Sequence, residues 1–102
     1  MLYIVFWEMK PEDIPKVIDK FRKRNEKGSE DMFGEGLKTV MTPHHIGYEP
    51  KGFTIMETGD PDTLANYSMY YMPELQMKIM PIHDSNKMVA SYLKYHPRAV
   101  IS

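Results

Sequence analysis

The segment that most constrains the fold is an apolar run near the start of the chain, because it is apolar on both of its faces. Residues 2–9 read Leu-Tyr-Ile-Val-Phe-Trp-Glu-Met, and Lys10 and Pro11 follow. This aromatic and β-branched composition predicts a β-strand. Alternate residues of a strand point to opposite faces. One face carries Tyr3, Val5 and Trp7, and the other carries Leu2, Ile4 and Phe6. Such a strand must be covered on both sides.

The remainder of the chain predicts alternating strands and helices around this segment. The predicted strands cover residues 2–9, 37–48, 53–58 and 76–83, and the predicted helices cover 12–27, 61–72 and a short segment from 85. Ile14, Val17, Ile18 and Phe21 recur at helical spacing, which predicts one buried stripe. The order β-α-β-β-α-β indicates a ferredoxin-like α+β fold with an antiparallel sheet in the order 4-1-3-2. Pro43 predicts an edge strand or a bulge.

In this plan both long helices lie on one face of the sheet, so they cover only one face of the central first strand. The uncovered face would be a large exposed apolar patch, which is unusual for a soluble monomer. We therefore expect two copies to pack face to face as a homodimer. The predicted organisation is a domain over residues 1–84 and a C-terminal helix and tail over residues 85–102. That extension packs on the same domain, where it would cover the open face, or on the partner subunit. The tail ends in an apolar run, Ala99-Val100-Ile101.

Charge and composition narrow the class of protein. The chain has 102 residues, with 13 basic and 14 acidic side chains and a formal net charge of −1. A nucleic-acid binder usually has a basic excess, so we expect no nucleic-acid partner. Cysteine is absent, which excludes a disulfide framework and a thiol nucleophile. No apolar run approaches the ~20 residues of a membrane span. No basic leader precedes the first apolar run, so we expect a cytoplasmic protein without a membrane partner.

Two stretches resemble a family of small, uncharacterised domains within the dimeric α/β-barrel superfamily. They are the opening strand closed by Met9-Lys10-Pro11, and the run Phe53-Thr54-Ile55-Met56-Glu57-Thr58-Gly59-Asp60-Pro61 with Leu64 and Pro81 beyond it. The resemblance covers about residues 1–84 and implies a homodimer with a ligand cleft between sheet and helices. The superfamily includes cofactor-free monooxygenases, isomerases and haem-degrading enzymes, so the resemblance implies no single chemistry. His44-His45 and the final 18 residues depart from its pattern.

The candidate catalytic residues are His44, His45 and Glu57. A hairpin turn at residues 49–52 would pair Tyr48 with Phe53 and His44 with Glu57, and a bulge nearer the turn would substitute His45. A carboxylate that orients an imidazole raises its basicity, which prepares a general base. The alternative is an ion pair at the sheet edge with no chemistry.

The candidate ligand-binding residues are Tyr3, Trp7, Tyr71 and His83. His83 ends the fourth strand, at the same end of the sheet as Tyr3 and Glu57, so a cluster with His44 or His45 is geometrically possible. Its spacing matches no metal motif, and we predict no metal and no cofactor. Trp7 lies at the other end of the first strand, where Tyr71 or Tyr70 could complete an aromatic cleft. The alternative is a core tryptophan with its N–H bonded near the rim.

Three functions remain open from the sequence. The first is a homodimer that binds a small apolar or aromatic molecule, with cofactor-independent monooxygenase or isomerase chemistry based on a histidine. The second is a non-catalytic ligand-binding or regulatory module on the same scaffold. The third is a haem or metal carrier that uses His44, His45 and His83. Whether the chain is an enzyme at all stays undecided at this point.

Overall fold

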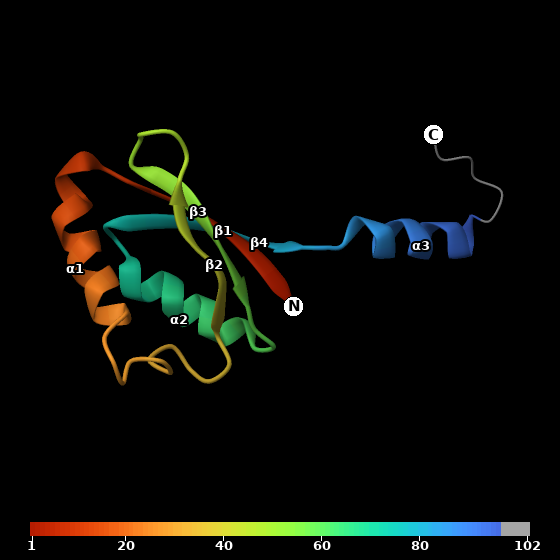
Figure 1. Ribbon diagram of the computed structural model, residues 1–102, viewed down its shortest axis with the longest axis horizontal. Coiled ribbons are helices and arrows are strands. Elements are labelled where there is room, and N and C mark those ends of the chain that lie inside the picture. Colours follow the sequence, from red (N-terminus) through yellow and green to blue (C-terminus); the bar gives the residue numbers. More distant parts are fainter. Residues whose placement is uncertain (97–102) are drawn as a thin grey trace.

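The structure, a computed structural model, describes residues 1–96. Its strands and helices follow one another in the predicted order (Figure 1). They are β1 (Leu2–Met9), the 3-10 turn η1 (Pro11–Asp13), α1 (Ile14–Arg24), β2 (Lys38–His45), β3 (Lys51–Glu57), α2 (Pro61–Tyr71), β4 (Leu75–Ile82) and α3 (Ser85–Tyr95). The apolar run predicted at residues 99–101 lies outside the described residues.

The sheet has the predicted topology. Its strands run in the order β2-β3-β1-β4, and every neighbouring pair is antiparallel. The ferredoxin-like α+β fold is therefore confirmed. Strand β1 is central, paired with β3 on one side and β4 on the other, and β2 is an edge strand, as the proline at position 43 predicts.

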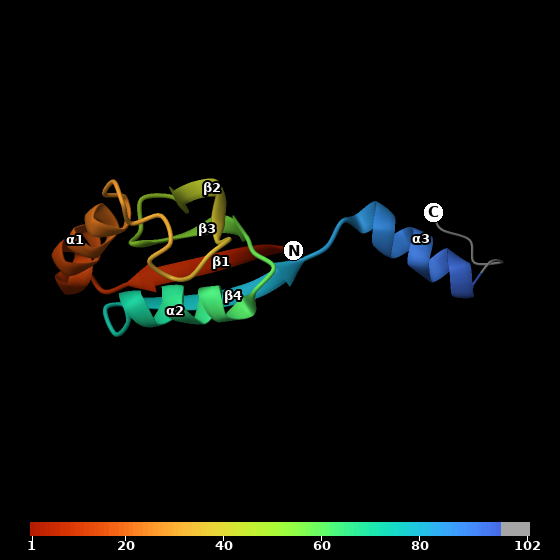
Figure 2. The ribbon, with the colours of Figure 1, turned by 90° about the horizontal axis from the view of Figure 1, so that it is seen from below.

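The core lies on one face of this sheet, between the strands and helices α1 and α2. Its buried apolar side chains come from every layer: Val5, Trp7, Val17, Phe33, Leu37, Met56, Leu64, Tyr67, Tyr71 and Leu75. Helix α2 runs along the sheet, and α1 lies at one end of the sheet (Figure 2). Burial of these side chains is the main force that holds the two helices to the sheet.

The opposite face, which we call the outer face, carries the second apolar set of β1. Ile4 lies opposite Ile55 of β3 and Met80 of β4. Phe6 lies opposite Phe53. These side chains are half-buried or exposed, and all the buried core residues of the sheet point the other way. The described residues thus leave one apolar face of β1 uncovered, as the sequence predicts.

The hairpin between β2 and β3 differs from the prediction. The turn predicted at residues 49–52 is wrong, because β3 already begins at Lys51. The chain reverses earlier, where Gly47 adopts a positive φ of 65° and the N–H of Ile46 bonds to the carbonyl of Lys51 at 3.0 Å. Only glycine adopts such a φ at no steric cost. The reversal therefore spans residues 47–50, two residues earlier than the predicted turn.

Two irregularities in β2 shift the pairing further. They fall between Thr39 and Met41 and between Met41 and His44. The second spans Pro43, so the predicted bulge is confirmed there. Each bulge adds one residue to β2 and reassigns every pair beyond it. The predicted pairing of His44 with Glu57 is wrong for these reasons, as the site geometry shows below.

Helices α2 and α3 begin at aspartate caps. The Asp60 carboxylate accepts a bond from the backbone N–H of Asp62 at 3.0 Å, and Pro61 takes the first helical position, as predicted. The Asp84 carboxylate accepts bonds from the N–H groups of Asn86 and Lys87 at 2.8 and 3.3 Å. Such caps satisfy N–H groups that have no partner inside the helix.

A substitution at Gly52 tests how closely β2, β3 and β1 pack against one another. A Cβ at this position would lie 2.5 Å from Cζ2 of Trp7 and closer still to the carbonyl oxygen of His44. We predict that Gly52→Ala lowers the free energy of unfolding by about 1–3 kcal/mol, the usual cost of overpacking. Gly59→Ala is the control, because a Cβ there meets nothing within 4 Å. Urea unfolding of both variants measures the effect, and equal stability of the two would contradict this packing.

Candidate functional site

A cleft of about 200 Å³ lies between the sheet and the two packed helices, at the end of β1 that carries Trp7. Side chains from five elements line it: Trp7 and Met9 of β1, Val17, Ile18 and Phe21 of α1, Pro43 and His45 of β2, Tyr67 and Tyr71 of α2, and Leu75 of β4. The lining is mostly apolar and aromatic, with few polar groups, which is the usual composition of a small-molecule site. Two other hollows carry several charged side chains each.

The helix stripe of α1 forms an open wall of this cleft. Its predicted burial is confirmed for Val17, but Ile18 and Phe21 are 49% and 43% exposed. Both residues line the cleft, and the other described residues cover only about half of each. A periodic apolar stripe predicts contact with something apolar. Within residues 1–96, the apolar stripe of α1 is therefore only partly covered.

Trp7 and Tyr71 line the cleft, and each carries one hydrogen-bonding group. Their side chains are 7% and 2% exposed. The indole Nε1 and the phenol oxygen are both fully buried, and neither has a hydrogen-bond partner among the described residues. A buried donor without a partner costs about 1–3 kcal/mol. The sequence prediction that Trp7 and Tyr71 share an aromatic cleft agrees with their positions.

The tyrosines of the cleft stay protonated far above neutral pH. Burial raises the pKa of Tyr67 to about 12. Burial also raises the pKa of Tyr71, and the neighbouring tyrosines add to the effect. Loss of the proton would leave a phenolate in an apolar setting, which is unfavourable. Tyr71 is therefore a neutral O–H group, a buried donor without a partner among the described residues.

The two adjacent histidines lie on opposite faces of the sheet. His45 pairs with Gly52 on the helix-covered face, where its ring meets the Trp7 indole edge-on at 4.9 Å between centroids. His44 pairs with Phe53 on the outer face, and their rings stack at 6.0 Å. Only His45 lines the cleft. The absence of a side chain at Gly52 leaves room for the Trp7 ring beside it.

Glu57 meets neither histidine. It pairs with Lys38 of β2 and with Leu2 of β1, on the outer face at the far end of the sheet from Phe53 and His44. The predicted carboxylate–imidazole pair is therefore wrong, whichever histidine is chosen. The prediction failed because it assumed a later turn, and the shifted hairpin moves both histidines along the strand away from Glu57.

The second predicted cluster does not form either. Tyr3 lies opposite Met56 and Pro81 on the helix-covered face, whereas Glu57 is on the outer face. His83 follows the last residue of β4 and is exposed. Neither Tyr3 nor His83 lines the cleft. Among residues 1–96, no three histidine or acidic side chains lie close enough together to hold a metal ion.

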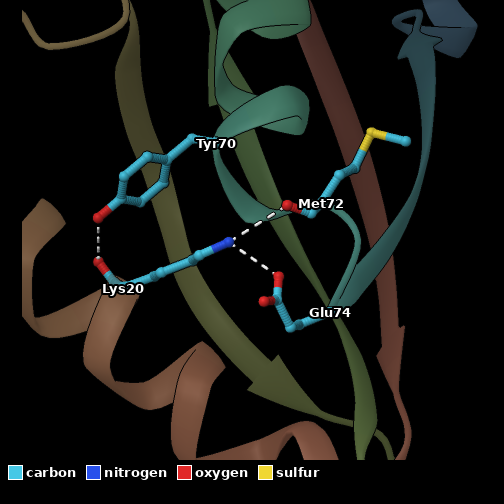
Figure 3. A network of polar contacts seen from close by, with 4 residues as sticks. All are labelled: Lys20, Tyr70, Met72 and Glu74. Carbon is cyan, nitrogen blue, oxygen red and sulfur yellow. Dashed lines mark hydrogen bonds and ion pairs between the residues drawn. The ribbon is translucent and has the colours of Figure 1, made fainter.

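A polar network holds α1 against the loop that follows α2 (Figure 3). The Lys20 ammonium group binds Glu74 Oε2 at 2.8 Å and the carbonyl oxygen of Met72 at 3.2 Å. The Tyr70 hydroxyl donates to the carbonyl oxygen of Lys20 at 2.9 Å. This network, the Lys20 clamp, joins the element that carries Ile18 to the loop between Tyr71 and Leu75, and none of its four residues lines the cleft. Sequence reasoning missed it, because Lys20 and Glu74 are 54 positions apart.

The chain belongs to a family described as a domain of unknown function (DUF3303), whose model matches residues 1–95. The match therefore includes α3 as well as the sheet and the packed helices. No curated protein and no solved structure matches the chain. Within the part of the chain that the structure describes, no helix is both long and apolar enough to cross a membrane.

The adjacent tyrosines of α2 provide a matched test of the unpartnered donor. We predict that Tyr71→Phe leaves the free energy of unfolding unchanged or raises it by about 1–3 kcal/mol, because it removes a buried O–H without a partner. Tyr70→Phe removes the bond to Lys20 and should lower stability by about 0.5–1.5 kcal/mol. Urea unfolding of both variants at neutral pH checks the two signs. A marked loss of stability in Tyr71→Phe would show that its hydroxyl has a structural partner.

The Lys20 clamp predicts a dependence of stability on acid. The hydrogen bond from Lys20 holds the pKa of Glu74 below its usual value. The stabilisation is therefore present at neutral pH and is lost as the pH falls through the lowered pKa. Between pH 6 and pH 3, stability should fall more in the wild-type chain than in Glu74→Gln. Glu49→Gln, which removes an exposed pair with the nearby Lys51, is the control and should keep the wild-type acid response.

Proposed function

We propose that this protein binds a small, largely apolar molecule in the cleft, and that the ligand carries a hydrogen-bond acceptor. The observation that carries this proposal is the pair of buried donors, Trp7 Nε1 and the Tyr71 hydroxyl, on side chains that line an open apolar cleft. Neither donor atom is exposed in this structure, so the proposal requires a rotation of the cleft side chains that lets an acceptor on the ligand reach them and offset the cost of leaving these donors unpaired. The exposed Ile18 and Phe21 at the mouth would be covered by the same ligand.

The size and chemistry of the cleft limit the ligand class. A cavity of about 150 Å³ lined by apolar side chains holds a benzene molecule. The present cleft, at about 200 Å³ and open on one side, suits a substituted single ring or a compact bicyclic compound. Aromatic walls favour a planar ring, because offset or edge-on ring contacts add to the gain from burial. Planar aromatic ketones, quinones and lactones combine such a ring with a carbonyl acceptor.

The proposal includes a homodimer formed through the outer face, as in dimeric α/β barrels. Its support is the row of apolar side chains around Ile4, Ile55 and Phe53, which the described chain leaves without a cover. Charges of both signs flank this row, including Glu57 beside Lys38 and Glu8 beside Lys51. A two-fold interface places a surface against itself, and a patch of mixed sign avoids the repulsion that a single sign would cause.

Enzymatic activity is the second candidate, and it depends on one residue. His45 is the only histidine among those predicted as catalytic that lines the cleft, and it contacts the Trp7 ring. In a monooxygenase or isomerase on this scaffold, His45 would be the base. The carboxylate expected to assist it, Glu57, pairs with Lys38 instead. Ligand binding needs no such assistance, so the geometry favours a binding protein over an enzyme.

A pair of related probes tests the binding proposal. Indan-1-one and indane share one bicyclic skeleton, but only the ketone has an acceptor. Isothermal titration calorimetry should show that the wild-type chain prefers the ketone. Tyr71→Phe should weaken ketone binding by about two- to tenfold, the value of one hydrogen bond, and leave indane binding unchanged.

Tyr70→Phe is the matched control, because the Tyr70 hydroxyl is bonded to Lys20 and Tyr70 does not line the cleft. It should bind both probes as the wild-type chain does. Equal affinity of the wild-type chain for ketone and indane, or binding of neither probe, would refute the role assigned to the two donors.

A further inference from the structure

Helix α3 is the one helix of residues 1–96 that packs on nothing. No residue of α3 is buried, whereas α1 and α2 each contribute to the core. Figures 1 and 2 show it projecting from the end of β4, away from the sheet and the other helices. The radius of gyration is 17.1 Å, against about 13 Å for a compact domain of this length. This elongation comes from α3.

An isolated helix of this length needs a packing partner. It has 11 residues, and helices shorter than about 12–15 residues are marginal in water without tertiary contacts. One side of α3 is apolar: Met88, Val89, Tyr92 and Leu93 are between 37% and 59% exposed. Lys87 and Lys94 lie on the opposite side. This is the pattern of a helix that buries one stripe.

The link before α3 directs the helix away from its own sheet. Only His83 and Asp84 separate the end of β4 from the start of α3. Asp84 is extended, with φ −65° and ψ 121°, and its carboxylate is engaged with the first turn of α3. For α3 to lie over its own outer face, the chain would have to reverse within these two residues. The structure shows an extended link instead.

We propose that α3 is an exchanged arm: in the dimer, the α3 helix of each copy packs its apolar stripe against the body of the other copy. This inference rests on the proposed dimer through the outer face and adds α3 to it. The match of the family to residues 1–95 places α3 within the domain rather than after it.

The area of the interface supports the exchange. Strands of seven or eight residues in a four-stranded sheet present a face of about 27 by 19 Å, or roughly 500 Å². A specific, stable interface buries about 800 Å² per partner. One side of α3 adds about 160 Å², and the surface it covers on the partner adds as much again. These are flat areas, which understate accessible surface, but on the same flat scale the exchanged helices enlarge the interface of each partner by more than half, from roughly 500 to roughly 820 Å².

The proposed arm is tested by measuring the oligomeric state of the protein as a function of its concentration. The full chain is compared with the double variant Val89→Glu/Leu93→Glu, which places two charges in the apolar stripe, and with Ser91→Glu, which places one charge outside it. Sedimentation velocity over a wide range of concentration gives the dimer dissociation constant. We expect the double variant to raise this constant by on the order of a hundredfold, and Ser91→Glu to leave it near the wild-type value.

Two further outcomes distinguish a failure of the proposed arm from a failure of the proposed dimer. A wild-type dimer that the double variant leaves equally tight would overturn the arm and retain the dimer. A wild-type chain that is monomeric throughout would overturn both. Trp7 is the sole tryptophan and lies in the body, so its fluorescence during unfolding shows whether each variant has kept its fold.

Discussion

The contact between the Trp7 indole and the bare backbone at Gly52 is the interaction on which the candidate site depends. Gly52 lies between Trp7 of β1 and the backbone of β2, so the indole occupies space that any side chain at position 52 would fill. His45 meets the edge of the same ring. From this arrangement follow the position of the cleft, its aromatic wall and the burial of the indole N–H. The Lys20 clamp joins α1 to the loop that precedes β4.

The cleft joins two features that reduce stability within the described chain. One is the pair of donors on Trp7 and Tyr71 without partners, and the other is the exposed apolar wall formed by Ile18 and Phe21. The other buried side-chain nitrogen and oxygen atoms of residues 1–96 have hydrogen-bond partners; Thr58 and Thr63, for example, bond to each other at 2.9 Å. Unfavourable features that gather at one place are expected at a functional site, where a ligand compensates for them.

The sequence predicts the architecture well because that architecture follows from patterns within single segments. The two apolar faces of residues 2–9, the cap at Asp60 and the proline at position 43 predict a central strand, the second helix and an irregular edge strand. The site depends on relations between segments. The early turn at Gly47 decides which histidine meets Trp7, and the two bulges beyond His44 decide which residue of β2 lies opposite Glu57. Pro43 indicates one bulge, but no local pattern reveals the other bulge or the register of the turn. Gly52 looks like a turn residue in the sequence, although its role is close approach. Trp7 and Tyr71 could be grouped from the strand and helix positions, but their lack of partners could not.

The most direct test of the central claim observes the Trp7 indole N–H itself. Because the chain has one tryptophan, a ¹H–¹⁵N correlation spectrum of the full chain contains a single indole resonance. Stepwise addition of indan-1-one should move this resonance in the direction of a stronger hydrogen bond until it saturates, together with the amide resonances of α1 and α2 at the cleft. An indole resonance that stays fixed, while amides of the outer face shift or none shift at all, would contradict the assignment of the cleft as the ligand site.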